Sequence, residues 1–125
     1  DTGLVSYLTR YSSPEILMNG AIAGSILENY IVSEIIKTYH NDAQECLIHY
    51  YRDKDCKEVD MIIESDGELH PIEIKKSANP SSQITGAFSI LDKSSVPRGT
   101  GAILCLKESL CAVDRQNYIV PAWMI

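Results

Sequence analysis

Residues 58–77 read EVDMIIESDGELHPIEIKKS, and this stretch decides the fold that we expect. Two runs rich in Val, Ile and Met, Val59–Glu64 and Leu69–Ser77, flank the dipeptide Asp66-Gly67. Asp-Gly between two apolar runs is a strong signal for a tight β-hairpin. The stretch therefore predicts two antiparallel strands joined by a short turn.

Charged residues interrupt both predicted strands. Because side chains alternate across a strand, Glu73, Lys75 and Ser77 share one face, and antiparallel pairing could bring Asp60 close to Glu73. Two adjacent carboxylates repel each other unless a cation lies between them. The turn length leaves the register open by a residue or two, and the alternative interpretation is the exposed polar face of an edge hairpin.

The remaining chain predicts helices on either side of these strands. Thr2–Asn19 is helix-like and broken at Ser12-Ser13-Pro14, and Gly20–His40 is the longest helical stretch. Further elements are expected as strands at Leu47–Arg52, Gly101–Leu106 and Tyr118–Val120, a turn at Asp53–Lys57 and a helix at Pro80–Lys93. This order predicts an α/β fold, a mixed β-sheet flanked by helices, with the fourth strand parallel to the third.

Length and composition indicate one domain. The 125 residues suffice for one modest core, with residues 1–19 as a helical extension and 20–125 as the core. The first residue is Asp1, so we expect a piece of a longer protein. No apolar run approaches the roughly 18 residues of a membrane span, and no secretory signal is visible, so we expect a cytoplasmic protein.

The charge and the cysteines exclude several classes of function. A net charge of −6 argues against a non-specific binder of polyanions. A small basic cluster, Arg52, Lys54 and Lys57, alternates with acidic residues and is typical of a solvated turn. The four cysteines, Cys46, Cys56, Cys105 and Cys111, form no Cys-x-x-Cys pair, so we expect free thiols in a reducing compartment.

Glu28 is the one charge in the middle of an apolar sector of the long helix. On a helical wheel it falls among Gly24, Ile31, Val32, Ile35 and Tyr39. A carboxylate packed among isoleucines must find a partner or lose its charge. Either Glu28 points toward the sheet and helps to hold a metal or its waters, or it only reaches the rim of a helix that is apolar nearly all round.

The residues Glu28, Asp60, Glu73 and Lys75, in that order, resemble the PD-(D/E)XK nuclease superfamily. Its core carries a helical Glu, an Asp at a strand and (Asp/Glu)-x-Lys on the next strand. Val59 stands where the superfamily's name has proline. This resemblance implies a restriction-endonuclease-like core.

A closer resemblance is to a domain of unknown function at the C-terminus of many bacterial and archaeal AAA-type ATPases, and it covers nearly the whole chain. That domain looks like Gly-x-x-x-Glu-Asn-x-(Val/Ile), then Tyr-Arg-Asp-Lys-Asp-x-x-Glu-Val-Asp, then Ile-Glu-(Ile/Val)-Lys. The matching residues here are Gly24, Glu28, Asn29 and Val32, then Tyr51–Asp55 and Glu58–Asp60, then Ile72–Lys75, with Asp1–Leu4 and Ile119–Trp123 similar to its edges. An ATPase domain in the parent chain is thereby implied as a partner.

The resemblance implies a divalent-metal-dependent nuclease that hydrolyses DNA phosphodiesters. Asp60, Glu73 and the carbonyl of Ile74 would hold Mg²⁺ or Mn²⁺, and Glu28 would hold a metal-bound water or a second ion. Lys75 would position the attacking water or stabilise the charge of the transition state. Gln83, Lys76 and Ser77 are the candidate contacts to the substrate.

Two other interpretations stay open. The domain could be a nuclease-like module that docks DNA or protein for an attached ATPase and never cuts, which the net charge of −6 favours. It could also be a dimerisation domain that uses the apolar Leu104–Leu106 strand or the C-terminal Trp123-Met124-Ile125.

Overall fold

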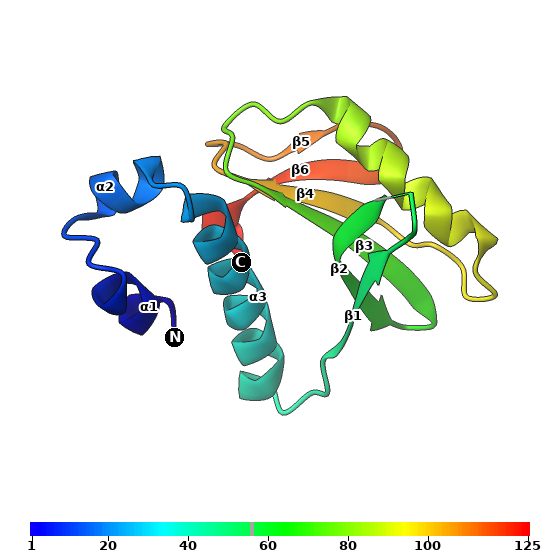
Figure 1. Cartoon of the computed structure of the whole chain (residues 1–125). Helices are drawn as coiled ribbons and strands as arrows, with labels where there is room; N and C mark the ends of the chain where they lie inside the picture. Colours follow the sequence, from blue (N-terminus) through cyan, green and yellow to red (C-terminus); the bar gives the residue numbers. More distant parts are fainter. Residues whose placement is uncertain (56) are drawn as a thin grey trace.

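A computed structural model describes residues 1–55 and 57–125, and in it a six-stranded sheet lies between helices (Figure 1). The strands are β1 Leu47–Arg52, β2 Glu58–Ser65, β3 Glu68–Lys75, β4 Gly101–Cys105, β5 Cys111–Ala112 and β6 Asn117–Pro121. The helices are α1 Thr2–Leu8, α2 Pro14–Asn19, α3 Ala23–Asn41 and two 3₁₀ helices, η1 Ser82–Lys93 and η2 Ala122–Met124. The predicted mixed α/β class is confirmed.

The strands lie in the order β1-β2-β3-β4-β6-β5. β1, β2 and β3 pair antiparallel, whereas β3 with β4 and β4 with β6 pair parallel. The prediction that the fourth strand runs parallel to the third is confirmed. β5 was not predicted, because two residues are too few to show a periodicity. β5 pairs antiparallel with β6 at the far edge. Strand β3 therefore lies inside the sheet, with an antiparallel neighbour, β2, on one side and a parallel neighbour, β4, on the other.

The turn between β2 and β3 follows the predicted Asp-Gly geometry. Asp66 and Gly67 have φ angles of 52° and 78°, both in the left-handed region. Two successive positive φ angles are what a type I′ turn requires, and its twist matches that of the flanking strands. The turn fixes the register of the hairpin, from Ser65 opposite Glu68 to Met61 opposite Ile72.

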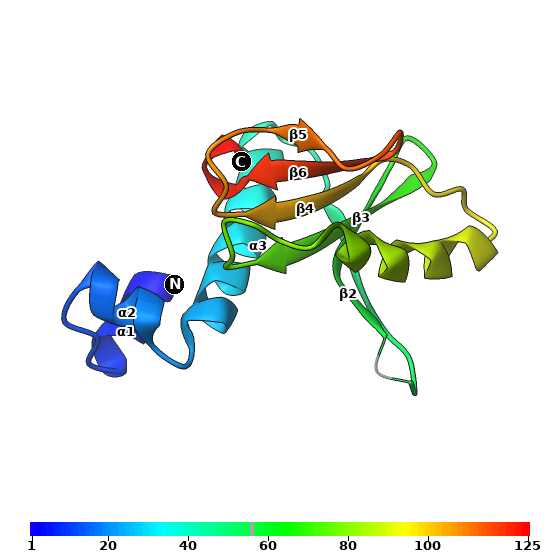
Figure 2. The ribbon, with the colours of Figure 1, turned by 90° about the horizontal axis from the view of Figure 1, so that it is seen from above.

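Helices cover both faces of the sheet and give the core two parts. On one face Ile31 of α3 packs against Met61, Ile72, Ile74 and Leu104. On the other face Phe88 and Leu91 of η1 pack against Val59 and Ile62 of β2. Figure 2 shows α3 and η1 on opposite sides of the sheet. The hairpin of β2 and β3 thus lies inside the sheet and not at its edge, and the side chains of Asp60 and Glu73 on it are only 11% and 9% exposed.

Several predicted boundaries differ by a few residues. The long helix begins at Ala23 instead of Gly20, and strands β3 and β4 end at Lys75 and Cys105, before the predicted Ser77 and Leu106. The helix predicted at Pro80–Lys93 is a 3₁₀ helix from Ser82, where the Ser81 hydroxyl accepts a hydrogen bond from the N–H of Gln83. A serine cap of this kind sets a helix start more sharply than a propensity does.

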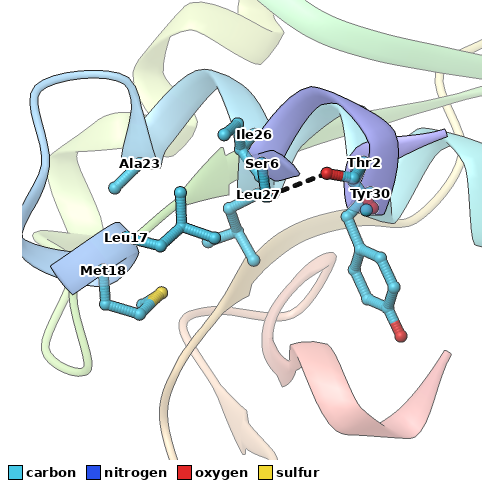
Figure 3. A pocket seen from close by; sticks show the side chains of 9 residues that line it. Thr2, Ser6, Leu17, Met18, Ala23, Ile26, Leu27 and Tyr30 are labelled. Atoms are coloured by element: carbon cyan, nitrogen blue, oxygen red, sulfur yellow. Dashed lines mark hydrogen bonds between the residues drawn. The ribbon is translucent and has the colours of Figure 1, made fainter. Parts of the chain in front are cut away.

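The N-terminal helices form a separate apolar corner. The predicted break is confirmed, because Ser13 caps α2 and Pro14 occupies its first turn. A cavity of about 260 Å³ lies between α1, α2 and α3 (Figure 3). It is lined by Thr2, Gly3, Ser6, Leu17, Met18, Ala23, Ile26, Leu27 and Tyr30.

Cys46, Cys105 and Cys111 carry free thiols, as predicted, while Cys56, which also belongs to the predicted turn at 53–57, lies outside the described residues. Within the part of the chain that the structure describes, no helix is long and apolar enough to cross a membrane.

Candidate carboxylate–lysine site

A β-bulge in β2 sets the position of Asp60. His49 of β1 pairs with Ile62 and Tyr51 pairs with Val59, so Asp60 and Met61 both stand opposite the single residue Tyr50. Such a bulge changes the direction in which a side chain leaves its strand. Here Val59 faces η1 and Met61 faces α3, although simple alternation would put both on one face.

The side chain of Asp60 accepts a backbone hydrogen bond at the end of the β2–β3 ladder. The last paired residues are Met61 and Ile72, and one step further along this register Asp60 stands opposite Glu73. Asp60 Oδ2 accepts a hydrogen bond of 2.7 Å from the backbone N–H of Ile74. The carboxylate therefore replaces a strand carbonyl as the acceptor, and this bond holds it against β3.

Lys75 joins the two carboxylates. Its ammonium Nζ lies 2.5 Å from Glu73 Oε1 and 3.6 Å from Asp60 Oδ2. One ammonium group thus reaches both carboxylates, and Asp60, Glu73 and Lys75 come together as predicted.

Glu73 is the most enclosed of these groups. The residue is 7% exposed, and its Oε2 is a buried oxygen with no hydrogen-bond partner among the described residues. Burial raises the pKa of Glu73, and the neighbouring charge of Asp60 adds to the rise, while the hydrogen bond from Lys75 opposes it. A buried carboxylate oxygen without a protein donor is uncommon, so Oε2 is an acceptor that a water or a cation could satisfy.

The pKa of Lys75 is also displaced. Burial would lower it, but the hydrogen bond to Glu73 and the charge of Asp60 outweigh burial and raise the pKa above that of an ordinary lysine. Lys75 is therefore a charged ammonium at neutral pH, and it neutralises one of the two carboxylates.

Glu28 lies at the margin of the cluster. Glu28 is exposed, while Ile31 of the same predicted apolar sector is fully buried. Partial burial raises the pKa of Glu28, and the charge of Asp60 raises it further. Glu28 thus lies within electrostatic range of Asp60, and its role as a metal ligand stays a prediction.

The predicted metal site has to be built from few protein ligands. Among residues 1–55 and 57–125, no group of three or more His, Cys, Asp or Glu is arranged to hold a metal ion. Asp60 and Glu73 alone fit a cation that keeps most of its waters, as Mg²⁺ does. The orphaned Oε2 of Glu73 fits such a cation as well.

The other predicted residues surround the cluster without joining it. Ile74 contributes its N–H to Asp60, whereas its carbonyl was the predicted ligand. Lys76 Nζ donates to the carbonyl of Met18 at 2.8 Å, which ties the end of β3 to α2. The Ser77 hydroxyl accepts from the N–H of Asn79, and Gln83 lies exposed at the start of η1. Their substrate contacts stay predictions.

A second buried polar residue, Asn117, was not predicted from the sequence, and the exposed Asp114 is its partner. Asp114 accepts hydrogen bonds from the backbone N–H groups of Gln116 and Asn117 and from the Asn117 amide. Gln116 in turn accepts from Arg98, which also donates to Asp92. The signal was the Asp114-x-x-Asn117 spacing, typical of a turn whose carboxylate caps backbone donors. Its contacts fix the start of β6.

These features define a mixed α/β domain with a carboxylate–lysine cluster on neighbouring central strands. The chain belongs to the family described as "Domain of unknown function (DUF4143)", whose model matches residues 23–125. Comparison with curated proteins and with solved structures gave no match. The matched segment contains the whole sheet, α3 and every residue of the cluster.

Proposed function

We propose that this domain is a divalent-metal-dependent nuclease with a restriction-endonuclease-like core, which hydrolyses DNA phosphodiesters as part of a longer AAA-type ATPase chain. One observation carries the proposal: Asp60, Glu73 and Lys75 meet on two central strands, although 15 positions separate the first from the last. Central strands are normally apolar on both faces, so buried charges there need a reason.

Each residue has a distinct task in this proposal. Asp60 and Glu73 would hold Mg²⁺ or Mn²⁺, and the hydrogen bond from Ile74 to Asp60 keeps one carboxylate oriented for that purpose. Lys75 would donate to a phosphate oxygen and stabilise the negative charge that develops there during cleavage. The bound cation would supply Lewis-acid chemistry by polarising the phosphate and acidifying a water.

The proposal is tested by incubating the purified chain with Mn²⁺ or Mg²⁺ and with duplex, single-stranded and branched DNA. Cleavage is expected in at least one case, and Lys75→Ala should lower its rate by about 100-fold or more, the usual loss of one electrostatic stabiliser. Lys107→Ala removes the same charge from the loop after β4 and serves as the matched control.

Two results would contradict the nuclease proposal. One is a folded wild-type chain that cuts none of the three DNA forms with either metal. The other is cleavage that survives in both Lys75→Ala and Glu73→Gln, because the activity would then belong to another site or to a contaminant.

A binding module is the second candidate. Two observations favour it: the net charge of −6 and the small number of carboxylates that meet. In this case the domain docks DNA or a protein for the ATPase and does not cut. Calorimetry separates the two candidates, because a module without a metal site takes up neither Mg²⁺ nor Mn²⁺ at millimolar concentration.

A further inference from the structure

The ammonium of Lys75 occupies the position of a cation between two carboxylates. It contacts Glu73 Oε1 at 2.5 Å and Asp60 Oδ2 at 3.6 Å. The ammonium contacts Oε1 of Glu73, while the other oxygen of that carboxylate, Oε2, is buried with no hydrogen-bond partner among the described residues.

Lys75 can leave this position more easily than the carboxylates can. Its side chain is 38% exposed, whereas those of Asp60 and Glu73 are 11% and 9% exposed. A lysine carries its charge on a flexible four-carbon stem, so the ammonium can move while the strand stays in place. The carboxylates are fixed by β2, by β3 and by the N–H of Ile74.

We propose that Lys75 is an internal counter-ion that competes with a divalent cation for Glu73, and that cation binding releases its ammonium toward the substrate. The release toward substrate rests on the proposed nuclease function, whereas the competition for Glu73 rests only on the cation site of that proposal. In the absence of the cation the ammonium stabilises the buried carboxylate. With the cation bound, the ammonium is free to contact a phosphate.

The competition predicts that removing the ammonium strengthens cation binding. A hydrogen bond between charged groups must be broken before the cation gains Glu73, so Lys75→Met should bind Mn²⁺ about tenfold more tightly than the wild type. Methionine keeps most of the length of the stem without the charge. A lysine that served only as a metal-site positioning group would give the opposite sign.

The test is calorimetric titration of the full chain with Mn²⁺ alone. Lys107→Met is the matched control, because it changes the net charge equally and lies in the loop after β4. Mn²⁺ affinity should rise in Lys75→Met, stay within about twofold in Lys107→Met and fall in Glu73→Gln. Equal or weaker binding in Lys75→Met overturns the proposal, and so does the absence of binding in both wild type and Lys75→Met.

A second measurement covers the case in which Lys75→Met does not fold. In the unaltered chain, titration with Mg²⁺ should shift the side-chain ammonium resonance of Lys75 in NMR spectra and leave that of Lys76 in place. An unshifted Lys75 resonance at saturating Mg²⁺ overturns the competition.

The DNA-cleavage assay separates this inference from the proposed function. A tighter Mn²⁺ site in Lys75→Met without cleavage by the wild type rejects the nuclease and keeps the competition. Cleavage by a wild type whose Mn²⁺ affinity is unchanged by Lys75→Met rejects the competition and keeps the nuclease.

Discussion

The sheet region and the N-terminal helical pair use apolar side chains in opposite ways. From Ala23 onward the chain buries Ile31, Met61, Phe88 and Ile103 almost completely. None of residues 1–22, all of which the structure describes, is buried, and Tyr7 and Leu8 are 78% and 67% exposed. The match to the family model also begins at Ala23. Apolar composition alone therefore does not locate the core. The buried apolar residues are those that belong to the sheet or pack against it.

The largest effect should come from the core on the η1 side. Phe88 is 1% exposed and touches Val59 and Ile62, so Phe88→Ala should lower the free energy of unfolding by about 3–5 kcal/mol. Urea unfolding followed by circular dichroism measures this loss. A loss below about 1 kcal/mol would show that η1 does not complete the core.

A smaller loss is expected from the hydrogen bond that closes the β2–β3 ladder. Asp60→Ala leaves the N–H of Ile74 without its acceptor, at a cost of about 1–3 kcal/mol in the free energy of unfolding. Asp60→Asn removes the same charge but keeps an oxygen acceptor, so it should cost less. Equal losses in the two variants would assign the effect to charge alone.

The ion pair of Lys75 should appear in the pH dependence of stability. The pKa of Lys75 is raised in the folded chain above the ordinary 10.5, so the folded state holds this proton more tightly. The stabilisation is fully present below pH 10.5 and is lost as the pH rises through the folded pKa. When the pH is raised from below this pKa to above it, the free energy of unfolding should fall more for the wild type than for Lys75→Met. Parallel curves would rule out the ion pair as the cause.

The smallest effect belongs to the helical pair. Leu8→Ser changes a side chain that is 67% exposed, and the free energy of unfolding should stay within about 0.5 kcal/mol of the wild type. The same unfolding titration measures it. A loss as large as that of Phe88→Ala would mean that α1 belongs to the cooperative core after all.

Local patterns allowed much of the sheet and of the site to be predicted. Strand alternation and the Asp66-Gly67 turn suffice to place β2 beside β3, and the charges of Asp60, Glu73 and Lys75 stand out from their apolar neighbours. The bulge at Asp60 could not be predicted, because it arises from the pairing of β2 with β1, a long-range event without a local pattern.

The exposure of Glu28 could not be predicted for a different reason. A helical wheel gives the angular position of a residue but not the height at which the helix crosses the sheet. Ile31 lies over the sheet and is fully buried, whereas Glu28, about one turn earlier, lies exposed. The hydrogen bond from Lys76 to Met18 could not be predicted from the sequence either, since it depends on how α2 approaches the end of β3.

The backbone N–H of Ile74 is a natural spectroscopic reporter. It donates to the Asp60 carboxylate and not to a backbone carbonyl of the neighbouring strand, so its chemical shift and its exchange with deuterated solvent depend directly on the position and charge of that carboxylate. Any cation, nucleotide or inhibitor that engages this carboxylate should perturb that one amide first. A single cross-peak can therefore serve as the readout when candidate ligands are screened.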